Sequence, residues 1–387
     1  MAERKESLAE RLDVKYWAFR VMAAITPLVP LWLARRLAVA VGALAWLVAG
    51  GLRERAERNL RHIPSLGADP AQLRQATRGV FITLALNYLD FFRGRFVTYE
   101  ELSRGWDIRD WDQFERAMRS GRGVIVLGAH LGPFEYAAWK MGELGYSMLT
   151  PAERLRPERF NQLVGQLRNH HRARLLPGDD RETLRELLAT LHAGDSVMFA
   201  VDRWVMGPAD AWPFFGEPAR LPTAPFALAA RSEAPVVMML PWRVGFDRVE
   251  AAVVVVTPER MPPEDGAGAA GAVGAAGAAE QSPVSPERLR GADREAAIAR
   301  MRQRTYATLE RYISAHPDQW VSALSIVWDA PTVHERQPKT ADNVKSSIES
   351  KEESGQARVS APREPARTAM DDVGGRREGQ SVGEARR

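Results

Sequence analysis

The sequence contains no cysteine among its 387 residues. Disulfide bonds, thiolate metal ligands and a cysteine nucleophile are therefore excluded, while a reducing compartment is compatible with the chain. There is no phosphate-binding loop, and no set of His, Asp and Glu has metal-ligand spacing. We therefore expect neither a metal ion nor a cofactor.

Long hydrophobic runs are also missing near the N-terminus. The uncharged runs Val21–Ala34 and Leu37–Leu52 hold 14 and 16 residues and are separated by Arg35-Arg36. Each is shorter than the roughly 18 to 20 residues that a straight helix needs to cross a bilayer. Pro27 and Pro30 further weaken the first run as a continuous helix. Three interpretations follow: a re-entrant or interfacial hairpin, one stretched spanning helix, or helices buried in the core.

Positive charge is concentrated near the N-terminus, although the net charge is only +4. Residues 1–63 hold eleven Lys and Arg against six Asp and Glu. A basic flank beside apolar sequence favours an anionic membrane surface, by about 1 kcal/mol per cation. No basic patch interleaved with aromatic residues appears, so nucleic acid is not an expected partner. We expect the first fifty-odd residues to associate with a membrane and to place an active site there rather than build it.

The most informative motif joins a histidine to a glutamate five residues later. The apolar run 124–127 predicts a buried strand, and the glycine and proline after it mark a tight turn. His130 lies in this turn, and Glu135 opens the helical stretch that follows. A carboxylate that holds the proton on one ring nitrogen fixes the tautomer, so the other nitrogen can take a proton from a hydroxyl. His130 and Glu135 are therefore the predicted catalytic pair.

Helical and strand-like stretches alternate along the rest of the chain. Strands are expected at 124–127, 196–201, 236–240 and 249–257. Helices are expected at 73–92, 111–118, 155–171, 181–192, 226–231 and 290–314. This alternation predicts an α/β fold, a mixed sheet flanked by helices. Ligand sites in such sheets lie beyond the carboxyl ends of the strands, where His130 and Asp202 both fall.

Composition divides the chain into three parts. These are a membrane-associating apolar helical segment at 1–53, a catalytic domain at 54–330 and a tail at 331–387. A flexible insertion is expected at 262–288, because residues 266–279 are only Gly, Ala and one Val. The tail has no aromatic residue and cannot bury enough apolar surface to offset the entropy of ordering, so we expect disorder there.

Later blocks follow the His–Glu motif along the chain. They are Arg168 within the arginine-rich stretch 159–172, Val201-Asp202-Arg203, the block 214–222 that contains Glu217, and His316-Pro317-Asp318-Gln319-Trp320. In this order, after His130-x4-Glu135, they resemble the lysophospholipid acyltransferase superfamily, and within it the bacterial branch that acylates glycolipids. The likeness covers roughly residues 15–330. Family members commonly carry Asn-Trp before the acid, where this chain has Pro133-Phe134.

The resemblance implies an O-acyltransferase with a glycerolipid acyltransferase-like fold on the cytoplasmic face of the plasma (inner) membrane. His130 would take the proton of an acceptor hydroxyl as that oxygen attacks the thioester carbonyl of acyl-CoA or an acyl carrier protein. Glu135 would stabilise the imidazolium. The acceptor would be a membrane glycolipid of the lipid A or mannoside type.

The resemblance also implies four substrate-binding residues, which are Arg168, Asp202, Arg203 and Glu217. Backbone amides of Leu131-Gly132, or the Arg203 side chain, would hold the oxyanion. Basic residues such as Arg154, Arg156 and Arg168 would bind phosphate on the donor or the acceptor.

Each of these residues also has a structural interpretation. His130 fits a structural histidine at a strand end whose ring nitrogens are hydrogen-bonded, and Glu135 fits a helix-start carboxylate favoured by the helix dipole. Arg168 fits a solvated basic face. Asp202 with Arg203 fits a structural pair, and Glu217 fits a brace in a turn. The whole chain likewise fits a non-catalytic membrane-bound lipid-binding protein, or a lipid ester hydrolase in which water replaces the acceptor.

Overall fold

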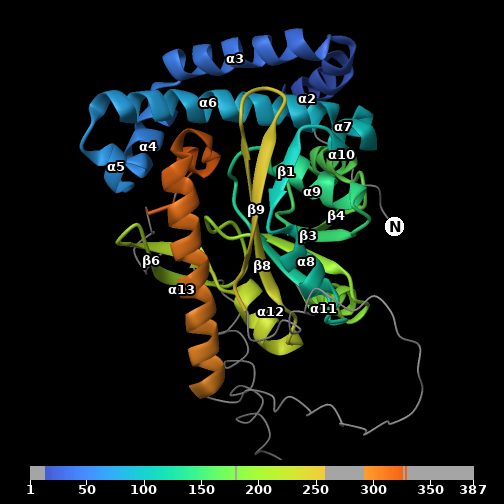
Figure 1. The fold of residues 1–387 in the computed structure, drawn as a ribbon. Coiled ribbons are helices and arrows are strands. Elements are labelled where there is room, and N and C mark those ends of the chain that lie inside the picture. Colours follow the sequence, from blue (N-terminus) through green and yellow to red (C-terminus); the bar gives the residue numbers. More distant parts are fainter. Residues whose placement is uncertain (1–13, 179–180, 258–291, 326, 329–387) are drawn as a thin grey trace, which may run out of the picture. The chain divides into compact units, whose positions relative to one another are not determined.

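A computed structural model describes residues 14–178, 181–257, 292–325 and 327–328 (Figure 1). Its centre is a seven-stranded sheet in the order β1-β9-β8-β2-β5-β3-β4. These strands are β1 (Trp106–Arg109), β2 (Val124–Gly128), β3 (Met148–Ala152), β4 (Ala173–Pro177), β5 (Ser196–Ala200), β8 (Val236–Arg243) and β9 (Val249–Val255). β8 and β9 pair antiparallel, and the other neighbours pair parallel. The remaining strands, β6 (Ala209–Phe214) and β7 (Glu217–Pro222), form an antiparallel hairpin.

Helices flank the sheet, which confirms the predicted mixed α/β class (Figure 1). The N-terminal helices are α2 (Val14–Ile25), η1 (Thr26–Leu28), α3 (Leu31–Val48), α4 (Gly50–Leu60), α5 (Pro64–Gly67), α6 (Pro70–Arg93) and η2 (Gly94–Phe96). The helices between strands are α7 (Tyr99–Ser103), α8 (Trp111–Met118), α9 (Phe134–Glu143), α10 (Glu158–Arg168), α11 (Arg181–His192) and α12 (Ala224–Ser232). The C-terminal ones are α13 (Ala292–Ala315), η4 (Pro317–Gln319) and η5 (Val321–Leu324).

The central strand β2 holds two hydrophobic layers together. All five of its residues are buried. Ile125 and Leu127 join a core cluster with residues of α11, α12 and α13. Val124 and Val126 join a second cluster with residues of α8 and α9. Because successive side chains of a strand point to opposite faces, the uninterrupted apolar run of β2 supplies both layers at once.

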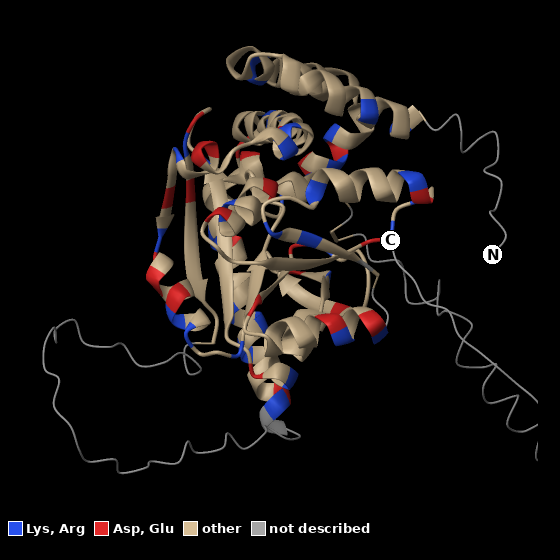
Figure 2. Ribbon diagram, turned by 90° about the vertical axis from the view of Figure 1, so that its right-hand side faces the viewer, with Lys and Arg blue, Asp and Glu red and all other residues tan. Residues whose placement is uncertain are grey.

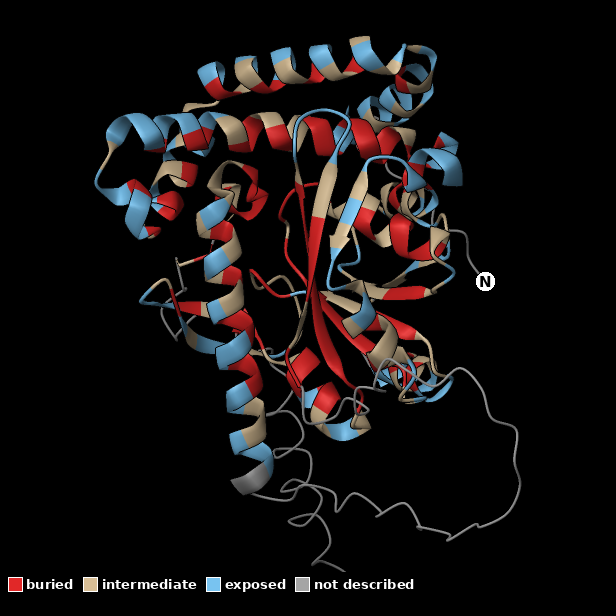
Figure 3. Cartoon of the chain, in the orientation of Figure 1, coloured by how far each residue is buried: buried red, intermediate tan, exposed pale blue. Residues whose placement is uncertain are grey.

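Two long helices, α3 and α6, lie one upon the other at one end of the sheet (Figures 1 and 3). Asp69 caps the start of α6, since its carboxylate accepts hydrogen bonds from the amides of Ala71 at 2.8 Å and Gln72 at 3.2 Å. A Cβ at Gly42 of α3 would lie 2.6 Å from the Cα of Ile82 in α6. The two helices therefore approach this closely because Gly42 has no side chain.

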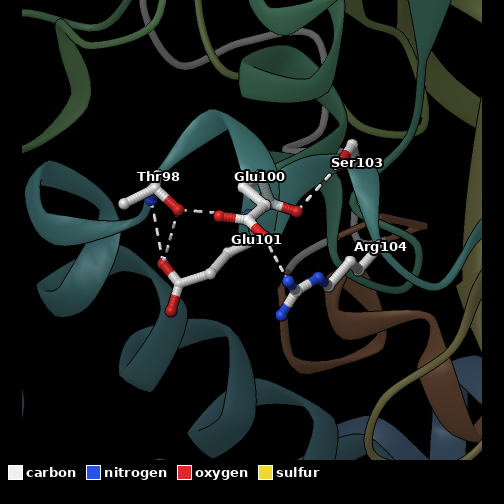
Figure 4. Close-up of polar contacts among 5 residues, drawn as sticks. All are labelled: Thr98, Glu100, Glu101, Ser103 and Arg104. Carbon is white, nitrogen blue, oxygen red and sulfur yellow. Dashed lines mark hydrogen bonds and ion pairs between the residues drawn. The ribbon is translucent and has the colours of Figure 1, made fainter.

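The short helix α7 carries the chain from α6 into the sheet. Its start is fixed by a capping box: the amide of Glu101 donates to the Thr98 hydroxyl at 3.2 Å, and the amide of Thr98 donates to the Glu101 carboxylate at 2.8 Å (Figure 4). One turn further on, Glu100 pairs with Arg104. This turn of helix leads directly to the edge strand β1.

The sequence predictions and the structure agree best in the middle of the fold. The four expected strands correspond to β2, β5, β8 and β9, and α8 and α11 have the expected bounds. The structure adds β1, β3, β4 and the hairpin of β6 and β7, which were not predicted. The expected insertion at 262–288 and the expected tail at 331–387 lie outside the described residues, so the three-part division of the chain stays a prediction.

Candidate active site

The neighbouring parallel strands β2 and β5 bring His130 and Asp202 together. In their register Gly128, the last residue of β2, pairs with Ala200, the last residue of β5. His130 and Asp202 each follow two residues later, and the amide of Val201 donates to the carbonyl of Gly128 at 3.0 Å. Both side chains therefore leave the same edge of the sheet at the same level.

His130 is bonded to Asp202 through both its ring and its backbone. The ring nitrogen Nδ1 lies 2.9 Å from Oδ1 of Asp202, and the backbone amide of His130 donates to Oδ2 at 3.1 Å. A carboxylate at Nδ1 holds the proton on that nitrogen, which leaves the lone pair of Nε2 free. The histidine side chain is 21% exposed, so this free nitrogen is accessible to a ligand.

Asp202 is fully buried and nevertheless ionised. Burial alone raises the pKa of a carboxyl group. Here the charge and the hydrogen bond of His130, together with the Ser322 and Trp320 side chains, outweigh burial and hold the pKa of Asp202 well below its usual value. The Trp320 indole donates to Oδ2 at 2.9 Å. Asp202 is therefore a fixed negative charge beneath the histidine at neutral pH.

Glu135 pairs with Arg168 and not with His130, which corrects the expected partner of the histidine. Arg168 donates from Nε to Oε1 of Glu135 at 2.7 Å, and its Nη2 lies 2.6 Å from the same oxygen. The reason is positional: Glu135 stands in the first turn of α9 and reaches the last turn of α10, while Asp202 occupies Nδ1. The Arg168 guanidinium also lies over the Phe91 ring, 5.5 Å from its centroid, so Arg168 is not a solvated cation.

His130 lies in a turn of residues 129–133, which we call the His130 turn. The segment after α13 forms hydrogen bonds with the backbone of this turn. The amide of Val321 donates to the carbonyl of His130 at 2.9 Å, and the amide of Gly132 donates to the carbonyl of Gln319 at 3.0 Å. Sequence reasoning noted the Pro-x-Gln-Trp block but not this role. Gln319 and Val321 in and after this block thus hydrogen-bond to the backbone at Gly132 and at His130.

Gly132 satisfies two demands of the His130 turn. Its φ is +54°, and a Cβ there would lie 2.5 Å from the carbonyl oxygen of Pro241, so the turn requires glycine. Its amide is bonded to Gln319, and therefore it is not available for the expected oxyanion role. Arg203, the other oxyanion donor that the sequence suggested, lines the cavity beside His130.

A cavity of about 1100 Å³ opens beside His130. Glu135, Arg168 and Arg203 supply part of its polar lining. Its apolar lining includes Phe19, Tyr88, Phe91, Phe134, Phe160, Leu187, Met198, Phe199 and Leu228. Pockets for drug-sized molecules hold about 300 to 1,000 Å³, so this cavity suits a large and mainly apolar ligand.

The N-terminal helices form part of this cavity. Phe19 of α2 and Leu52 of α4 both line it. Phe19 packs edge-on against Phe92 and Phe160, with ring centroids 5.2 and 5.0 Å apart. The expectation that this segment places the site without building it is therefore wrong, because two of its side chains belong to the wall.

The other predicted contacts divide between the cavity and the surface. Phe134, which stands in place of the usual tryptophan, lines the cavity with its ring edge-on to His130, 5.1 Å between centroids. Glu217 is exposed at the start of β7, beside the hairpin turn, and is not among the lining residues. Arg154 and Arg156 are exposed and do not line the cavity either. The turn position of Glu217 matches its structural interpretation.

Sequence reasoning missed a buried ion pair behind the His130 turn. Asp90 of α6 pairs with Arg243 at the end of β8. Burial raises the pKa of Asp90 to about 6, although Arg243 lowers it. The Arg243 guanidinium also donates to Oδ1 of Asn87 at 3.4 Å, and the Asn87 amide donates to the carbonyl of Gly132 at 2.8 Å. The signal was present as Asn87 and Asp90 within an otherwise apolar stretch of α6.

The site combines a parallel-rich α/β sheet, a histidine bonded to a buried carboxylate at its carboxyl edge and a large apolar cavity. Across the residues that the structure describes, no group of three or more His, Cys, Asp and Glu is placed to hold a metal ion. These features define an α/β protein with a histidine–carboxylate site that faces a lipid-sized cavity.

The chain belongs to the bacterial lipid A biosynthesis acyltransferase family, whose profile matches residues 2–323. This membership agrees with the family resemblance of the motif blocks. It accounts for the order in which those blocks occur along the chain.

The chain is similar to phosphatidylinositol mannoside acyltransferases from mycobacteria. The chain is 26% identical to that of Mycolicibacterium smegmatis over 196 residues, which is 50% of this chain and 64% of the relative. It is 27% identical to that of Mycobacterium tuberculosis over 160 residues, 40% of this chain and 51% of the relative. The matches thus span about half to two thirds of these relatives.

Proposed function

We propose that this protein is an O-acyltransferase. It moves a fatty acyl group from a thioester, acyl-CoA or an acyl carrier protein, to a hydroxyl of a membrane glycolipid. The observation that carries the proposal is the His130–Asp202 pair beside a large apolar cavity, in a chain of this family. The family description and the names of the relatives favour an acceptor of the lipid A or mannoside type.

His130 acts as the general base. Its Nε2 takes the proton from the acceptor hydroxyl while the hydroxyl oxygen attacks the thioester carbonyl carbon. The carbon–sulfur bond then breaks, the acyl group stays on the acceptor oxygen, and the imidazolium returns its proton to the departing thiolate. Asp202 stabilises the imidazolium, because it is a buried carboxylate already bonded to Nδ1.

Arg203 and Arg168 have different tasks in this mechanism. Arg203 lines the cavity directly after Asp202 and is the side chain we assign to the developing oxyanion. Arg168 is held on the cavity wall by Glu135, with its guanidinium partly neutralised. That pair suits the orientation of a polar headgroup or a donor phosphate rather than proton transfer.

We place the active site at the cytoplasmic face of the plasma membrane. The outward faces of α2, η1 and α3 carry large exposed apolar side chains, namely Val14, Trp17, Val21, Met22, Ile25, Leu28, Trp32, Leu37, Val41, Leu44, Leu47 and Val48. Figure 3 shows the contrast between this exposed face and the side of α3 that meets α6. A contiguous apolar surface of this kind is typical of a membrane-binding site.

Charge on the same helices supports an anionic lipid surface. Residues 14–53 contain Lys15, Arg20, Arg35, Arg36 and Arg53 and no Asp or Glu. In Figure 2, the helices at the top of the view accordingly carry blue residues and no red ones. Basic residues beside an inserted apolar face bind anionic headgroups.

The arrangement of α3 favours an interfacial position over a spanning one. Within the described residues α3 is the helix long and apolar enough to cross a bilayer, by length and composition. It lies lengthwise on α6, however, and buries Ala34, Ala38 and Gly42. A spanning orientation would separate these residues from α6, so we propose that α3 lies in the plane of one leaflet.

Product analysis with purified protein tests the proposed activity. The assay supplies an acyl thioester and glycolipid acceptors, and it measures free thiol together with the lipid products by mass spectrometry. Transfer predicts one acylated lipid for each thiol released. Free fatty acid formed from an ester lipid, without acylated product, identifies a hydrolase. Unchanged thioester with bound lipid identifies a binding protein, and either result contradicts the proposal.

A further inference from the structure

The Trp320 side chain is fully buried and donates its indole N–H to the carboxylate that holds His130. We propose that Trp320 is a positioning residue, which fixes the orientation and the charge of Asp202 and through it the proton affinity of His130. This inference rests on the proposed function, since it assigns Trp320 a part in the same general-base site.

The hydrogen bonds of Asp202 explain why the indole matters. Oδ1 accepts from Nδ1 of His130, while Oδ2 accepts from the His130 amide at 3.1 Å and from the Trp320 indole at 2.9 Å. An indole N–H is a donor only and does not ionise near neutral pH. Trp320 can therefore hold Oδ2 without competing for the proton that moves between the substrate and His130.

Trp320 is itself held rigidly. Its ring packs edge-on against Phe214 and Trp328, with centroids 6.1 Å apart in both pairs and interplanar angles of 78° and 83°. On the backbone, Trp320 forms a β-bridge with Leu131 of the His130 turn. One residue thus links the backbone beside His130 to the side-chain partner of His130, which suits a positioning role.

Other charged groups near the pair are independent of the indole. Glu135 of α9 and Arg168 of α10 are bonded to each other, and Arg203 lies beyond β5 on the cavity wall. Burial raises the pKa of Tyr306 on α13, so this residue remains a neutral phenol at ordinary pH. The indole N–H donates to Asp202 and not to these groups, and therefore we expect a changed pH response of Trp320→Phe to report the lost N–H.

The sign of the expected pH effect follows from the hydrogen bonds. Without the indole N–H, the charge of Asp202 is shared among fewer donors, so Asp202 attracts the Nδ1 proton of His130 more strongly. The imidazolium then persists to higher pH. General-base catalysis needs the neutral ring, and the acid limb of the pH–rate profile should consequently move to higher pH.

Trp320→Phe tests this inference against Trp328→Phe. Trp328 belongs to the same aromatic cluster, but its indole donates to the carbonyl of Phe214 at 3.3 Å instead of to Asp202. At metal sites, loss of the hydrogen-bond partner behind a ligating histidine typically costs about 10- to 100-fold in affinity or activity, and we take the lower end as the guide for the His130–Asp202 pair. We expect at least about a tenfold fall in kcat/KM at neutral pH and an acid limb moved to higher pH for Trp320→Phe only.

A second measurement separates this inference from the acyltransferase proposal. The rate at which diethyl pyrocarbonate modifies His130, followed by peptide mass spectrometry across pH, reports the neutral ring without any turnover. A shift to higher pH in Trp320→Phe supports the positioning role even if no acyl transfer is found. Active enzyme with unchanged profiles in both measurements overturns the positioning role and leaves the proposed function intact.

Folding of the variant is controlled by an isosteric replacement. Benzothienylalanine in place of Trp320 keeps the bicyclic ring and removes only the N–H. The same shift in both profiles is expected with this residue. If it leaves them unchanged, or if the loss of rate is equal at all pH values, Trp320 supports the fold alone and the inference is wrong.

Discussion

Two carboxylates lie near His130, and their surroundings give them different chemistry. Asp202 is buried, ionised and bonded to the ring, whereas Glu135 lies on the cavity wall with its charge partly neutralised by Arg168. Only a carboxylate in contact with the ring can set its tautomer and stabilise the imidazolium. Replacement of each acid by its amide should therefore lower activity to different extents at the two positions.

Asp202→Asn should lower kcat/KM by about 10² to 10⁴, the range typical for loss of general-base catalysis. An amide in this position can present N–H to Nδ1 and so favour the wrong tautomer. Glu135→Gln should cost less, because it weakens only the bond to Arg168. Glu143→Gln is the matched control, since Glu143 lies on the same helix and pairs with Lys140. Steady-state kinetics on the three variants decides, and an effect of Glu135→Gln greater than that of Asp202→Asn would contradict the assignment.

His130 itself was predictable from the sequence, and its partner was not. A histidine after a buried apolar run and before a helix start already indicates a site at a strand end. The choice between Glu135 and Asp202 depends on which strands are neighbours, and 67 residues, 129–195, separate β2 from β5 in the chain. The parallel register, unknown from local pattern, places Asp202 level with His130.

At the scale of elements, the predicted strands were those with the strongest apolar signal. β2 and β8 are buried along nearly all of their length and read as continuous hydrophobic runs. β1 and β4 are the edges of the sheet, and β1 shows mixed polarity. β3 contains Pro151 and β4 ends at Pro177, and proline inside a run argues against a strand unless the strand is at an edge.

The orientation of α3 in the membrane can be measured because the chain has no cysteine of its own. Leu37→Cys and Val48→Cys place spin labels on the exposed face, about 16 Å apart along the helix axis. A helix in the plane of one leaflet predicts equal depths for the two labels by power saturation in vesicles. A spanning helix predicts depths that differ by most of that distance.

A third site serves as the control for the spin-label experiment. Ala38 is buried against α6, so a label at Ala38→Cys should report little contact with lipid. If Ala38→Cys is as exposed to lipid as Leu37→Cys, α3 has left α6 and the interfacial arrangement is wrong.

At the scale of the whole molecule, the helix α2 belongs both to the proposed membrane face and to the cavity wall. α2 and α3 expose apolar side chains on one side, and Phe19 of α2 lines the cavity on the other. Binding to a bilayer should therefore bring the cavity to the headgroup region. Substitution of exposed apolar residues by acids should therefore weaken membrane binding without changing the cavity wall.

Val41→Glu with Leu44→Glu should abolish flotation with anionic vesicles and transfer to bilayer-embedded acceptor. Both positions are exposed, so transfer to detergent-dispersed acceptor should be retained within a fewfold. The matched control adds two acids to exposed positions of α11, Ala189→Glu with His192→Glu. Equal flotation of the two variants would refute the membrane role of α3, and loss of activity in detergent would show that α3 is needed for the fold.

The most direct measurement of the central claim compares His130→Ala with His192→Ala in the coupled assay of thiol release and lipid acylation. His192 is exposed at the end of α11 and does not line the cavity. The account predicts a loss of about 10² to 10⁴ in turnover for His130→Ala, with unchanged folding and vesicle binding, and wild-type turnover for His192→Ala. Near-wild-type acyl transfer by folded His130→Ala would contradict it.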